Sequence, residues 1–544
     1  MRDSIKWVAN RMPKSDDRQL SIMSLGNVAK ARFFHSSFPQ YSITPLARLD
    51  GMAKYLGLGG LFVKDESFRF GLNAFKVLGG SFAMARYIAK EMGRDVSEMT
   101  YDYLTSEAFR QEFGHATFFT ATDGNHGRGV AWAAHKLGQK AVVHMPKGSS
   151  QARYENIAKE GAQVTILERN DRVGKKILQT GNGKCNLGNR ALSVECYHGG
   201  DLEWIRDVLE HFDTEDTIRF FQSIGLMVKE KNGYLYPVCE QAAAVLDVLR
   251  YELQALGVEI QYQCKITKVE RLASGKLQVS DGEKTWQFDA VIVTCGGKAA
   301  PATGSDGSGF KIAKKMGHTC IPSVPALVQL RCKETDLLKG IAGVRADSEI
   351  RVFCDGGEIC RERGELQLTD YGISGIPIFQ LSRRVNYLLR DRRNVTAQID
   401  FLPDLTQESY EELQAGRKLL QGDRTAEEFF TGMLHKKLTA ALLKMAGIRL
   451  ATLMKEIPEE KIHAYYNLCR NLKLHITESN PYENAQVSAG GVDVREVKPT
   501  MESKICSGVY FAGEILDVDG RCGGYNLQWA WSSGYLAGYH AALA

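Results

Sequence analysis

Hydrophobic and polar positions in the first 170 residues alternate between strand-like and helix-like spacing. Apolar runs of strand length lie at 116–122, 141–146 and 163–168, and apolar residues recur at helical spacing in 127–138 and 149–161. The order strand, helix, strand, helix, strand predicts parallel strands joined by right-handed crossovers. We therefore expect the last two strands to lie in one sheet.

Two polar, glycine-containing stretches accompany these elements. The first, KDESFRFGLNAFKVLGG at 64–80, follows a short strand at 61–64 and places Lys76 at the start of a helix predicted for 76–93. Such a lysine can form a Schiff base beside an anion-binding helix terminus, although a plain surface lysine fits the same pattern. The second, TATDGNHGRG at 120–129, follows a strand and has the composition of an anion cradle.

Together the NAFK and TDGNHG motifs resemble diaminopropionate ammonia-lyase, a pyridoxal-phosphate enzyme of the tryptophan-synthase-like fold. The resemblance covers residues 1–162. It implies Lys76 as the lysine that holds pyridoxal 5'-phosphate, Asp123 as the base, and Asn125 and Gly127 near the cofactor or the substrate carboxylate. That family also needs a second half with a phosphate loop and a partner for the pyridine nitrogen, and neither is recognisable after residue 168.

Composition changes at the end of this stretch. All twelve cysteines lie from Cys185 onward. Residues 1–162 carry 22 Lys and Arg against 15 Asp and Glu, whereas the remainder carries 47 against 49. The sequence therefore predicts two unrelated pieces joined near Gly161 to Glu168.

The second piece contains three widely separated glycine-rich segments, each running from or into a predicted strand. They are LERNDRVGKKILQTGNGKCNLGN at 167–189, DAVIVTCGGKAAPATGSDGSGFKIAKKMG at 289–317 and GVYFAGEILDVDGRCGGYNLQWAWSSG at 508–534. A carboxylate that ends a strand, here Glu168, accepts hydrogen bonds from ribose hydroxyls, and glycines allow a ligand to approach the backbone. Lys175 and Lys176 are candidates for facing phosphate.

These segments resemble a bacterial family of NAD(P)/FAD-dependent oxidoreductases, the aminoacetone-oxidase-like flavoproteins, which includes 3-dehydro-bile acid reductases. The resemblance runs from about 163 to 544. It implies FAD, with NAD(P)H as a possible electron donor, and a cofactor site made of Glu168, Lys175, Gly181, Asn182, Gly183, Asn186, Gly296, Gly297, Gly513, Glu514, Gly523, Gly524 and Asn526. Cys522 stands where the family usually has Thr.

One part of the flavoprotein pattern is replaced. The family begins with a strand and a GxGxxG loop that holds the pyrophosphate, and the equivalent register here places Met145, Lys147 and Ser150 at the three glycine positions. Side chains at positions that need a positive φ cost about 1 kcal/mol or more each. We expect weakened FAD binding, with Lys147 and the amides after Gly148 as partial compensation.

The predicted architecture is α/β. Its parts are a partial pyridoxal-phosphate fold type II segment at 1–140, a Rossmann-like FAD-binding domain at 141–320, a β-barrel at 321–400, a helical subdomain at 401–480 and the C-terminal part of the FAD-binding domain at 481–544. Within the FAD-binding domain, Asn232-Gly233 predicts a hairpin and 258–288 a β-meander.

Charge and hydropathy argue against several functional classes. A net charge of +5 without basic blocks gives no footprint for nucleic acid. No segment has the length of a signal-peptide core or a membrane span, so we expect a cytoplasmic protein without membrane contact. The cysteines form no CxxC pair, which favours reduced thiols and no metal site. A small molecule is the expected partner, and the sequence does not indicate the oligomeric state.

Three functional hypotheses follow from these patterns. The first is an FAD-dependent oxidoreductase that transfers hydride to or from an unidentified small molecule and is impaired by the lost loop. The second is a pyridoxal-phosphate ammonia-lyase acting through Lys76 and Asp123. The third is a fusion protein without catalytic activity.

Overall fold

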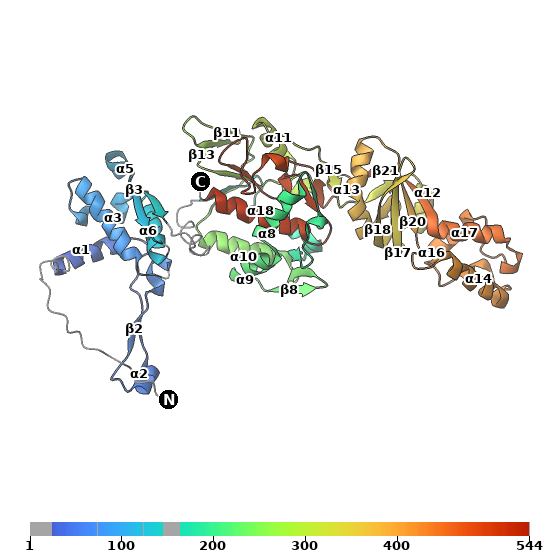
Figure 1. Cartoon of the computed structure of the whole chain (residues 1–544), viewed down its shortest axis with the longest axis horizontal. Coiled ribbons are helices and arrows are strands. Elements are labelled where there is room, and N and C mark those ends of the chain that lie inside the picture. Colours follow the sequence, from blue (N-terminus) through green and yellow to red (C-terminus); the bar gives the residue numbers. More distant parts are fainter. Residues whose placement is uncertain (1–23, 73, 123, 145–163, 543–544) are drawn as a thin grey trace. The chain divides into compact units, whose positions relative to one another are not determined.

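The chain folds as two units, residues 1–163 and 164–544. The structure is a computed structural model, and it describes residues 24–72, 74–122, 124–144 and 164–542. Figure 1 labels some of the elements of each unit, and the two units are described separately below.

The first unit contains the predicted alternation of strands and helices. Strands β3 (Thr117–Ala121) and β4 (Lys140–His144) pair in parallel around helix α6 (Asn125–Lys136), with Thr117 opposite Lys140. The expected strand at 61–64 is β2 and the expected helix at 76–93 is α3, so both predictions are confirmed. The remaining bounds are α1 Leu25–Ser36, β1 Leu46–Arg48, α2 Asp50–Leu56, β2 Phe62–Lys64, α3 Val77–Glu91, α4 Tyr101–Leu104 and α5 Glu107–Phe113.

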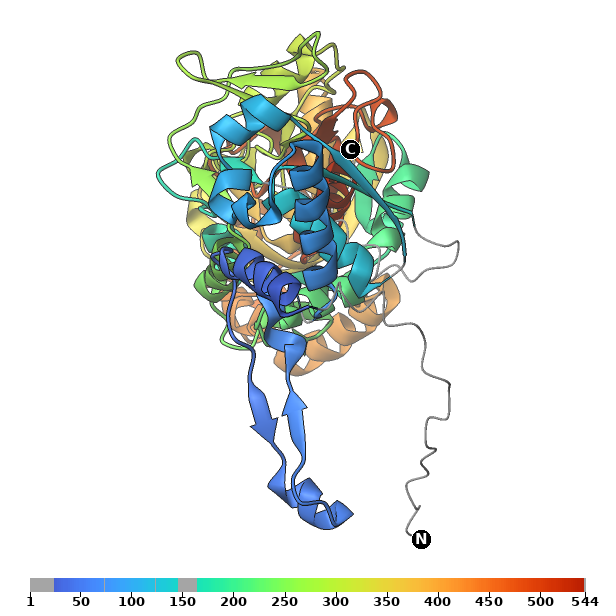
Figure 2. The same ribbon diagram turned by 90° about the vertical axis from the view of Figure 1, so that its left-hand side faces the viewer.

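Helices α3 and α6 pack closely because glycine lies at their crossing. A Cβ atom on Gly129 would lie 2.8 Å from the Cα atom of Val77, the first residue of α3. The aromatic rings of Phe38, Phe70 and Trp132 are buried beside this crossing. By contrast, the β1–β2 hairpin and α2 project from the helices as an arm (Figure 2).

The second unit carries its glycine-rich segments on parallel strand pairs. Strand β5 (Thr165–Leu167) pairs with β10 (Glu259–Gln261), and β14 (Val291–Val293) pairs with β23 (Val509–Phe511). The long helix α18 (Tyr525–Ala541) packs against α8 in this part of the molecule (Figure 1). Other elements here are β6 Gly188–Asn189, β7 Tyr197–Gly199, α8 Leu202–His211, α9 Thr214–Ser223, α10 Ala242–Ala255, α11 Ser308–Lys315, β15 Val324–Ala326, β22 Val487–Ala489 and β24 Val518–Gly520.

The expectation that 141–146 and 163–168 share one sheet is wrong for their described residues. Strand β4 pairs with β3 in the first unit, whereas β5 pairs with β10 in the second. The physical reason is that β5 forms its backbone hydrogen bonds with β10, a strand of its own unit. It therefore does not need to pair with the strands of the lyase-like unit. The predicted helix at 149–161 lies outside the described residues.

Local turn chemistry produces the expected hairpin and meander. Asn232 and Gly233 have φ values of 53° and 82°, as a type I′ turn requires, and connect β8 (Val228–Lys231) to β9 (Tyr234–Pro237). Antiparallel strands β11 (Lys268–Arg271), β12 (Leu277–Ser280) and β13 (Thr285–Phe288) form the meander.

A closed six-stranded barrel follows, as predicted. Its order is β16–β19–β18–β17–β20–β21, and its interior is filled by aliphatic side chains such as Ile350, Leu366 and Ile399. The chain leaves after β20, forms four helices and returns as β21, which lies beyond 321–400 and closes the barrel. The bounds are β16 Leu330–Cys332, α12 Thr335–Ile341, β17 Arg345–Cys354, β18 Gly357–Leu368, β19 Gly372–Ser374, α13 Ile376–Arg390, β20 Val395–Asp400, α14 Gln407–Gln421, α15 Ala426–Phe430, α16 Lys436–Met445, α17 Glu459–Asn471 and β21 Leu472–Ser479.

None of the helices in the described ranges is long and apolar enough to cross a membrane. All twelve cysteines are free thiols. Among described residues, no group of three His, Cys, Asp or Glu side chains is arranged to hold a metal ion.

Candidate functional site

Parallel pairing brings two of the glycine-rich segments to one edge of the second unit. Gly296 and Gly297 follow β14, while Gly513 and Glu514 follow β23, and these two strands are neighbours. Because parallel strands end at the same edge, the two segments meet there, although about 200 residues separate them. This juxtaposition is what a dinucleotide site requires.

A chain of hydrogen bonds fixes this edge. One carboxylate oxygen of Glu514 pairs with the Nζ atom of Lys176, and the other accepts from the backbone N of Ser488 at 2.9 Å. The hydroxyl of buried Ser488 accepts from the backbone N atoms of Lys298 and Ala299 at 2.7 and 2.9 Å. Lys176, a candidate from the sequence for facing phosphate, forms an ion pair with Glu514.

Glycine is required at both positions after β14. The φ of Gly296 is +70°, in the left-handed region. A Cβ atom on Gly297 would lie 2.7 Å from the Oγ atom of Ser488. Glycine at 297 therefore lets the loop pack closely against Ser488 and Glu514, which hold it in place.

The segment 181–186 forms a second cradle. Gly181, Asn182 and Gly183 have consecutive positive φ values of 54°, 53° and 82°. The side-chain oxygen of Asn186 is buried and has no hydrogen-bond partner among the described residues. A Cβ atom on Gly524 would lie 2.7 Å from this oxygen, so the cradle adjoins the turn before α18.

That turn is stabilised by its own side chain. Asn526 accepts from the backbone N of Gly520 at 2.8 Å and donates to the Gly520 carbonyl at 2.8 Å. Gly523 and Gly524 adopt φ values of 130° and 96°, and no side chain caps α18 within the described residues. The first amides of this long helix are therefore available to a ligand.

Glu168 occupies the end of β5 as predicted from the sequence. Its Oε1 atom accepts from the backbone N and the Nδ2 of Asn170 at 2.7 and 2.8 Å. Asn170 also donates to the Thr303 carbonyl at 3.0 Å, which ties β5 to the loop after β14. Lys175 pairs with Asp171 at 2.6 Å on the surface of the same segment.

These residues fit a flavin dinucleotide. They supply a strand-end carboxylate for a ribose, glycine backbone without side-chain obstruction, an unpartnered amide oxygen and an uncapped helix terminus. Met145, Lys147 and Ser150, which replace the pyrophosphate loop, lie outside the described residues.

A cavity of about 410 Å³ opens beside the turn before α18. Gln380 of α13 accepts from the backbone N of Cys522 at 3.1 Å, and Arg521 pairs with both oxygens of Glu362 at 2.9 Å. The cavity therefore lies between the dinucleotide-binding part and the barrel. Its lining residues are Glu195, His198, Cys360, Arg361, Glu362, Gln380, Leu381, Arg383, Arg384 and Arg521.

Burial and the arginines set the charges around this cavity. Burial lowers the pKa of His198 to about 4, and Arg383, Arg521 and Arg384 add to the effect, so the imidazole is neutral at pH 7. Opposite His198 in the strand pair β7–β24 lies Asp519. Burial raises the pKa of Asp519 to about 7, although Arg383 counteracts this.

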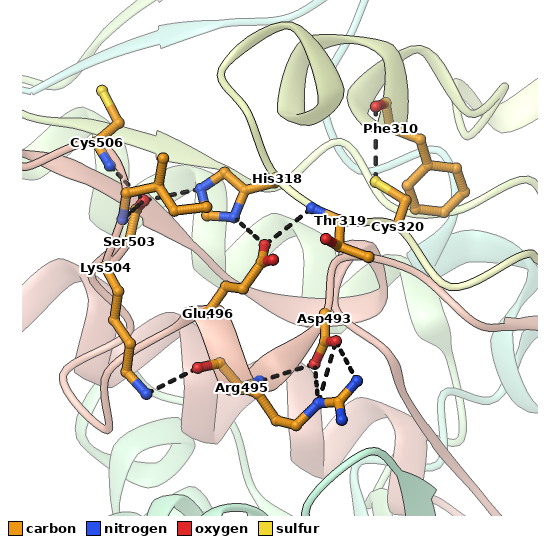
Figure 3. Close-up of polar contacts among 11 residues, drawn as sticks. Phe310, His318, Thr319, Cys320, Asp493, Arg495, Glu496, Ser503, Lys504 and Cys506 are labelled. Carbon is orange, nitrogen blue, oxygen red and sulfur yellow. Dashed lines mark hydrogen bonds and ion pairs between the residues drawn. The ribbon is translucent and has the colours of Figure 1, made fainter.

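Another polar cluster resembles a Ser–His–carboxylate relay (Figure 3). His318 Nδ1 lies 3.0 Å from Glu496 Oε2, and its Nε2 lies 2.8 Å from Ser503 Oγ. However, the His318 side chain is fully buried, and Ser503 Oγ also accepts from the backbone N atoms of Ile505 and Cys506. The buried Ser503 hydroxyl already has three hydrogen-bond partners and is not accessible to a substrate. The cluster therefore has a structural role.

In the first unit, the crossing of α3 and α6 brings the two lyase-like motifs together. Lys76 immediately precedes α3 and is exposed, and Asn125 begins α6, in which Gly127 is buried. The close approach of Gly129 to Val77 places the start of α3 beside the second turn of α6. Asp123 lies outside the described residues.

Comparison with known proteins follows this division. Residues 152–540 match the family described as HI0933-like protein Rossmann domain. The chain belongs to the HI0933-like family. Residues 38–207 match the pyridoxal-phosphate dependent enzymes, so the predicted chimeric architecture is confirmed.

Two relatives cover most of the HI0933-like part. The 3-dehydro-bile acid delta(4,6)-reductase of Clostridium scindens is 43% identical over 388 residues, 70% of this chain and 93% of the reductase. The ribosomal RNA dihydrouridine synthase of Haemophilus influenzae is 29% identical over 388 residues, 70% of this chain and 92% of the synthase. This part of the chain is therefore a flavoprotein oxidoreductase by family.

The lyase-like part is shorter than its relatives. The diaminopropionate ammonia-lyase of Salmonella typhimurium is 46% identical over 173 residues, which are 31% of this chain and 43% of the lyase. The chain thus spans less than half the length of that enzyme.

Sequence reasoning missed the residues around the cavity. The signals were an Arg383-Arg384 pair within an amphipathic helix and the acidic residues Asp517 and Asp519 within an otherwise buried strand segment. Nothing local in the sequence links these positions to His198, because only the β7–β24 pairing joins them.

Proposed function

We propose that the HI0933-like unit is an FAD-dependent reductase. Its proposed substrate is a 3-dehydro-bile acid whose Δ4,6 double bonds are conjugated with the 3-oxo group, or a close analogue. The observation that carries this proposal is the 43% identity to the bile-acid reductase over 93% of that enzyme's length. It is supported by the parallel pairing of β14 with β23, which brings Gly296 and Gly297 to the same edge as Glu514, and by the Asn170–Thr303 hydrogen bond that ties the end of β5 to this loop.

Each region has a distinct role in this proposal. When bound, FAD supplies reversible hydride transfer through N5. Glu168 orients a ribose, the backbone at Gly296 and Gly297 admits the dinucleotide, and the Ser488–Glu514 network keeps that backbone rigid. The cavity beside Arg521 receives the substrate, whose double bond gains a hydride and a proton.

We propose further that FAD binding is weakened. Met145, Lys147 and Ser150 replace three glycines, and side chains at such positions obstruct the approach of a pyrophosphate to the backbone. NADH or NADPH is the proposed electron donor. The proposed partner remains a small molecule, without nucleic acid or membrane.

The visible spectrum of the purified chain tests the cofactor. A two-banded flavin spectrum supports the proposal, and a colourless protein that also fails to take up added FAD contradicts it. Activity is then measured by incubating the FAD-loaded chain with a 3-oxo-Δ4,6 bile acid and NADH or NADPH. Mass spectrometry should show a gain of two hydrogen atoms for each double bond reduced, with the C. scindens reductase as positive control.

A second candidate is pyridoxal-phosphate chemistry at Lys76, favoured by the 46% identity of this part to the ammonia-lyase. The described residues of the first unit do not fit the complete cofactor site, because they contain no counterpart of the second half that holds the phosphate. We therefore derive no reaction through it. A single aldimine absorption band, fixed onto Lys76 by borohydride and located by peptide mapping, would support this candidate.

A further inference from the structure

We propose that the arginine-lined cavity between the dinucleotide-binding part and the barrel binds the carboxylate of the substrate, with Arg384 as its principal cation. This inference rests on the proposed function, because it names the group by which that substrate is held. It adds a specificity-determining residue that family membership does not assign.

The first step is the balance of charges in the cavity. Four arginines and two glutamates line it. Arg521 pairs with Glu362 and Arg361 pairs with Glu358. Carboxylates of the protein therefore already match these two guanidinium groups. Glu195 also lines the cavity and has no ion-pair partner among the described residues, so it opposes the binding of an anion.

The second step is the difference between the two adjacent arginines of α13. Arg383 is held by the buried carboxyl of Asp519, with its Nε atom 2.9 Å from Oδ1. The Nη1 atom of Arg384 donates to the Ile359 carbonyl at 2.7 Å, and Arg384 has no carboxylate partner among the described residues. Its remaining donors are available to a bidentate anion, which a planar guanidinium suits.

The third step is position. Gln380 and Arg521 attach the cavity to the turn that carries Gly523 and Gly524. A molecule anchored at Arg384 would therefore extend along the same turn that adjoins the proposed flavin site. A volume of about 410 Å³ lies within the usual range of small-molecule sites.

A small carboxylic acid fits these observations better than RNA. Binding along a phosphate backbone needs a track of several basic side chains, whereas Arg384 is one exposed cation on the lining of a cavity, without a carboxylate partner among the described residues. Residues 163–544 also carry two more acidic than basic residues. The neutral His198 adds no charge to the cavity.

Equilibrium binding to the full chain tests the inference without turnover. The probes are cholate and cholate methyl ester, which differ by the negative charge, titrated calorimetrically into the chain with and without added FAD. We expect the ester to bind about tenfold or more weakly than the acid, because a hydrogen bond to a charged group is lost. Equal affinities, or binding of neither probe, would overturn the inference.

Three variants locate the effect. Arg384→Gln should weaken cholate binding about tenfold and leave ester binding within about twofold. Glu195→Gln should strengthen cholate binding, because it removes the lining carboxylate that repels an anion. Arg345→Gln, on an exposed arginine of β17 paired with Glu365, is the matched control and should change neither affinity.

The results separate this inference from the proposed function. If charge-selective binding holds but no bile acid is reduced, the proposed reaction is wrong and the anion site stands. If reduction occurs and Arg384→Gln binds cholate normally, the anion site is wrong. Displacement of cholate by a short oligoribonucleotide at similar concentrations would assign the cavity to RNA phosphate and overturn the inference.

Discussion

The Nε atom of Arg383 lies 2.9 Å from the Oδ1 atom of Asp519, which joins α13 of the barrel region to β24 of the dinucleotide-binding part. Asp519 is almost completely buried, and its neighbour Asp517 is buried as well. The contact therefore places a guanidinium group and a buried carboxyl where two structural layers meet, beside the cavity that we propose as the substrate site.

This buried carboxyl makes stability depend on pH. Burial raises the folded-state pKa of Asp519 to about 7, above its ordinary value of 3.8. The native state binds the proton more tightly, so this stabilising contribution is complete below about pH 4 and is lost as pH rises through 7. Relative to Asp519→Asn, the wild-type chain should lose about 1 kcal/mol per pH unit across this window.

Urea unfolding of both proteins at pH 5 and pH 8 measures the effect. Asp336→Asn, which removes a fully exposed carboxylate of α12, is the control and should show no comparable change with pH. A constant difference between wild type and Asp519→Asn at both pH values would contradict the assigned pKa.

The replaced pyrophosphate loop gives a gain-of-binding prediction. Changing Met145, Lys147 and Ser150 together to glycine should raise flavin affinity, because glycine has no side chain to obstruct the approach of a pyrophosphate to the backbone. Flavin content after reconstitution, measured from absorbance near 450 nm relative to that at 280 nm, reports the change. Unchanged or lower content in the triple variant would show that this register does not hold the cofactor.

Gly297 provides a loss-of-binding prediction. Gly297→Ala should reduce flavin uptake about tenfold, because the new methyl group would lie 2.7 Å from Ser488 Oγ and displace the hydroxyl that holds the loop amides. Fluorescence titration with FAD measures the affinity. Gly340→Ala in α12, where a Cβ atom meets nothing within 4 Å, is the control and should bind FAD normally. Equal uptake by both variants would refute the assignment of this loop.

Ser503 should behave as a structural residue. Ser503→Ala leaves the backbone N atoms of Ile505 and Cys506 and one nitrogen of His318 without their buried acceptor or donor, so the free energy of unfolding should fall by about 1–3 kcal/mol. Denaturant unfolding tests this, with Ser223→Ala at an exposed serine as control. Labelling of wild-type Ser503 by a fluorophosphonate would instead reveal a reactive serine and contradict this interpretation.

The sequence by itself determined the local elements and the chimeric division. Asn232-Gly233 specified its hairpin because a type I′ turn needs two residues that tolerate positive φ. Apolar periodicity located β3, α6 and β4, since burial of one face is a local requirement. The glycine-rich motifs identified candidate ligand contacts because few other residues allow such backbone conformations.

Tertiary structure decided which distant residues meet. The β14–β23 pairing brought Gly297 and Glu514 to the same edge. Strand β21, which follows four helices in the sequence, closed the barrel. The same level of structure separated β4 from β5, which sequence spacing had placed together. Residue spacing determines which local helices and strands the chain can form. Strand pairing depends instead on which of several distant strands forms the more stable hydrogen-bonded pair. The Arg383–Asp519 contact and the cavity beside it arise only from that competition.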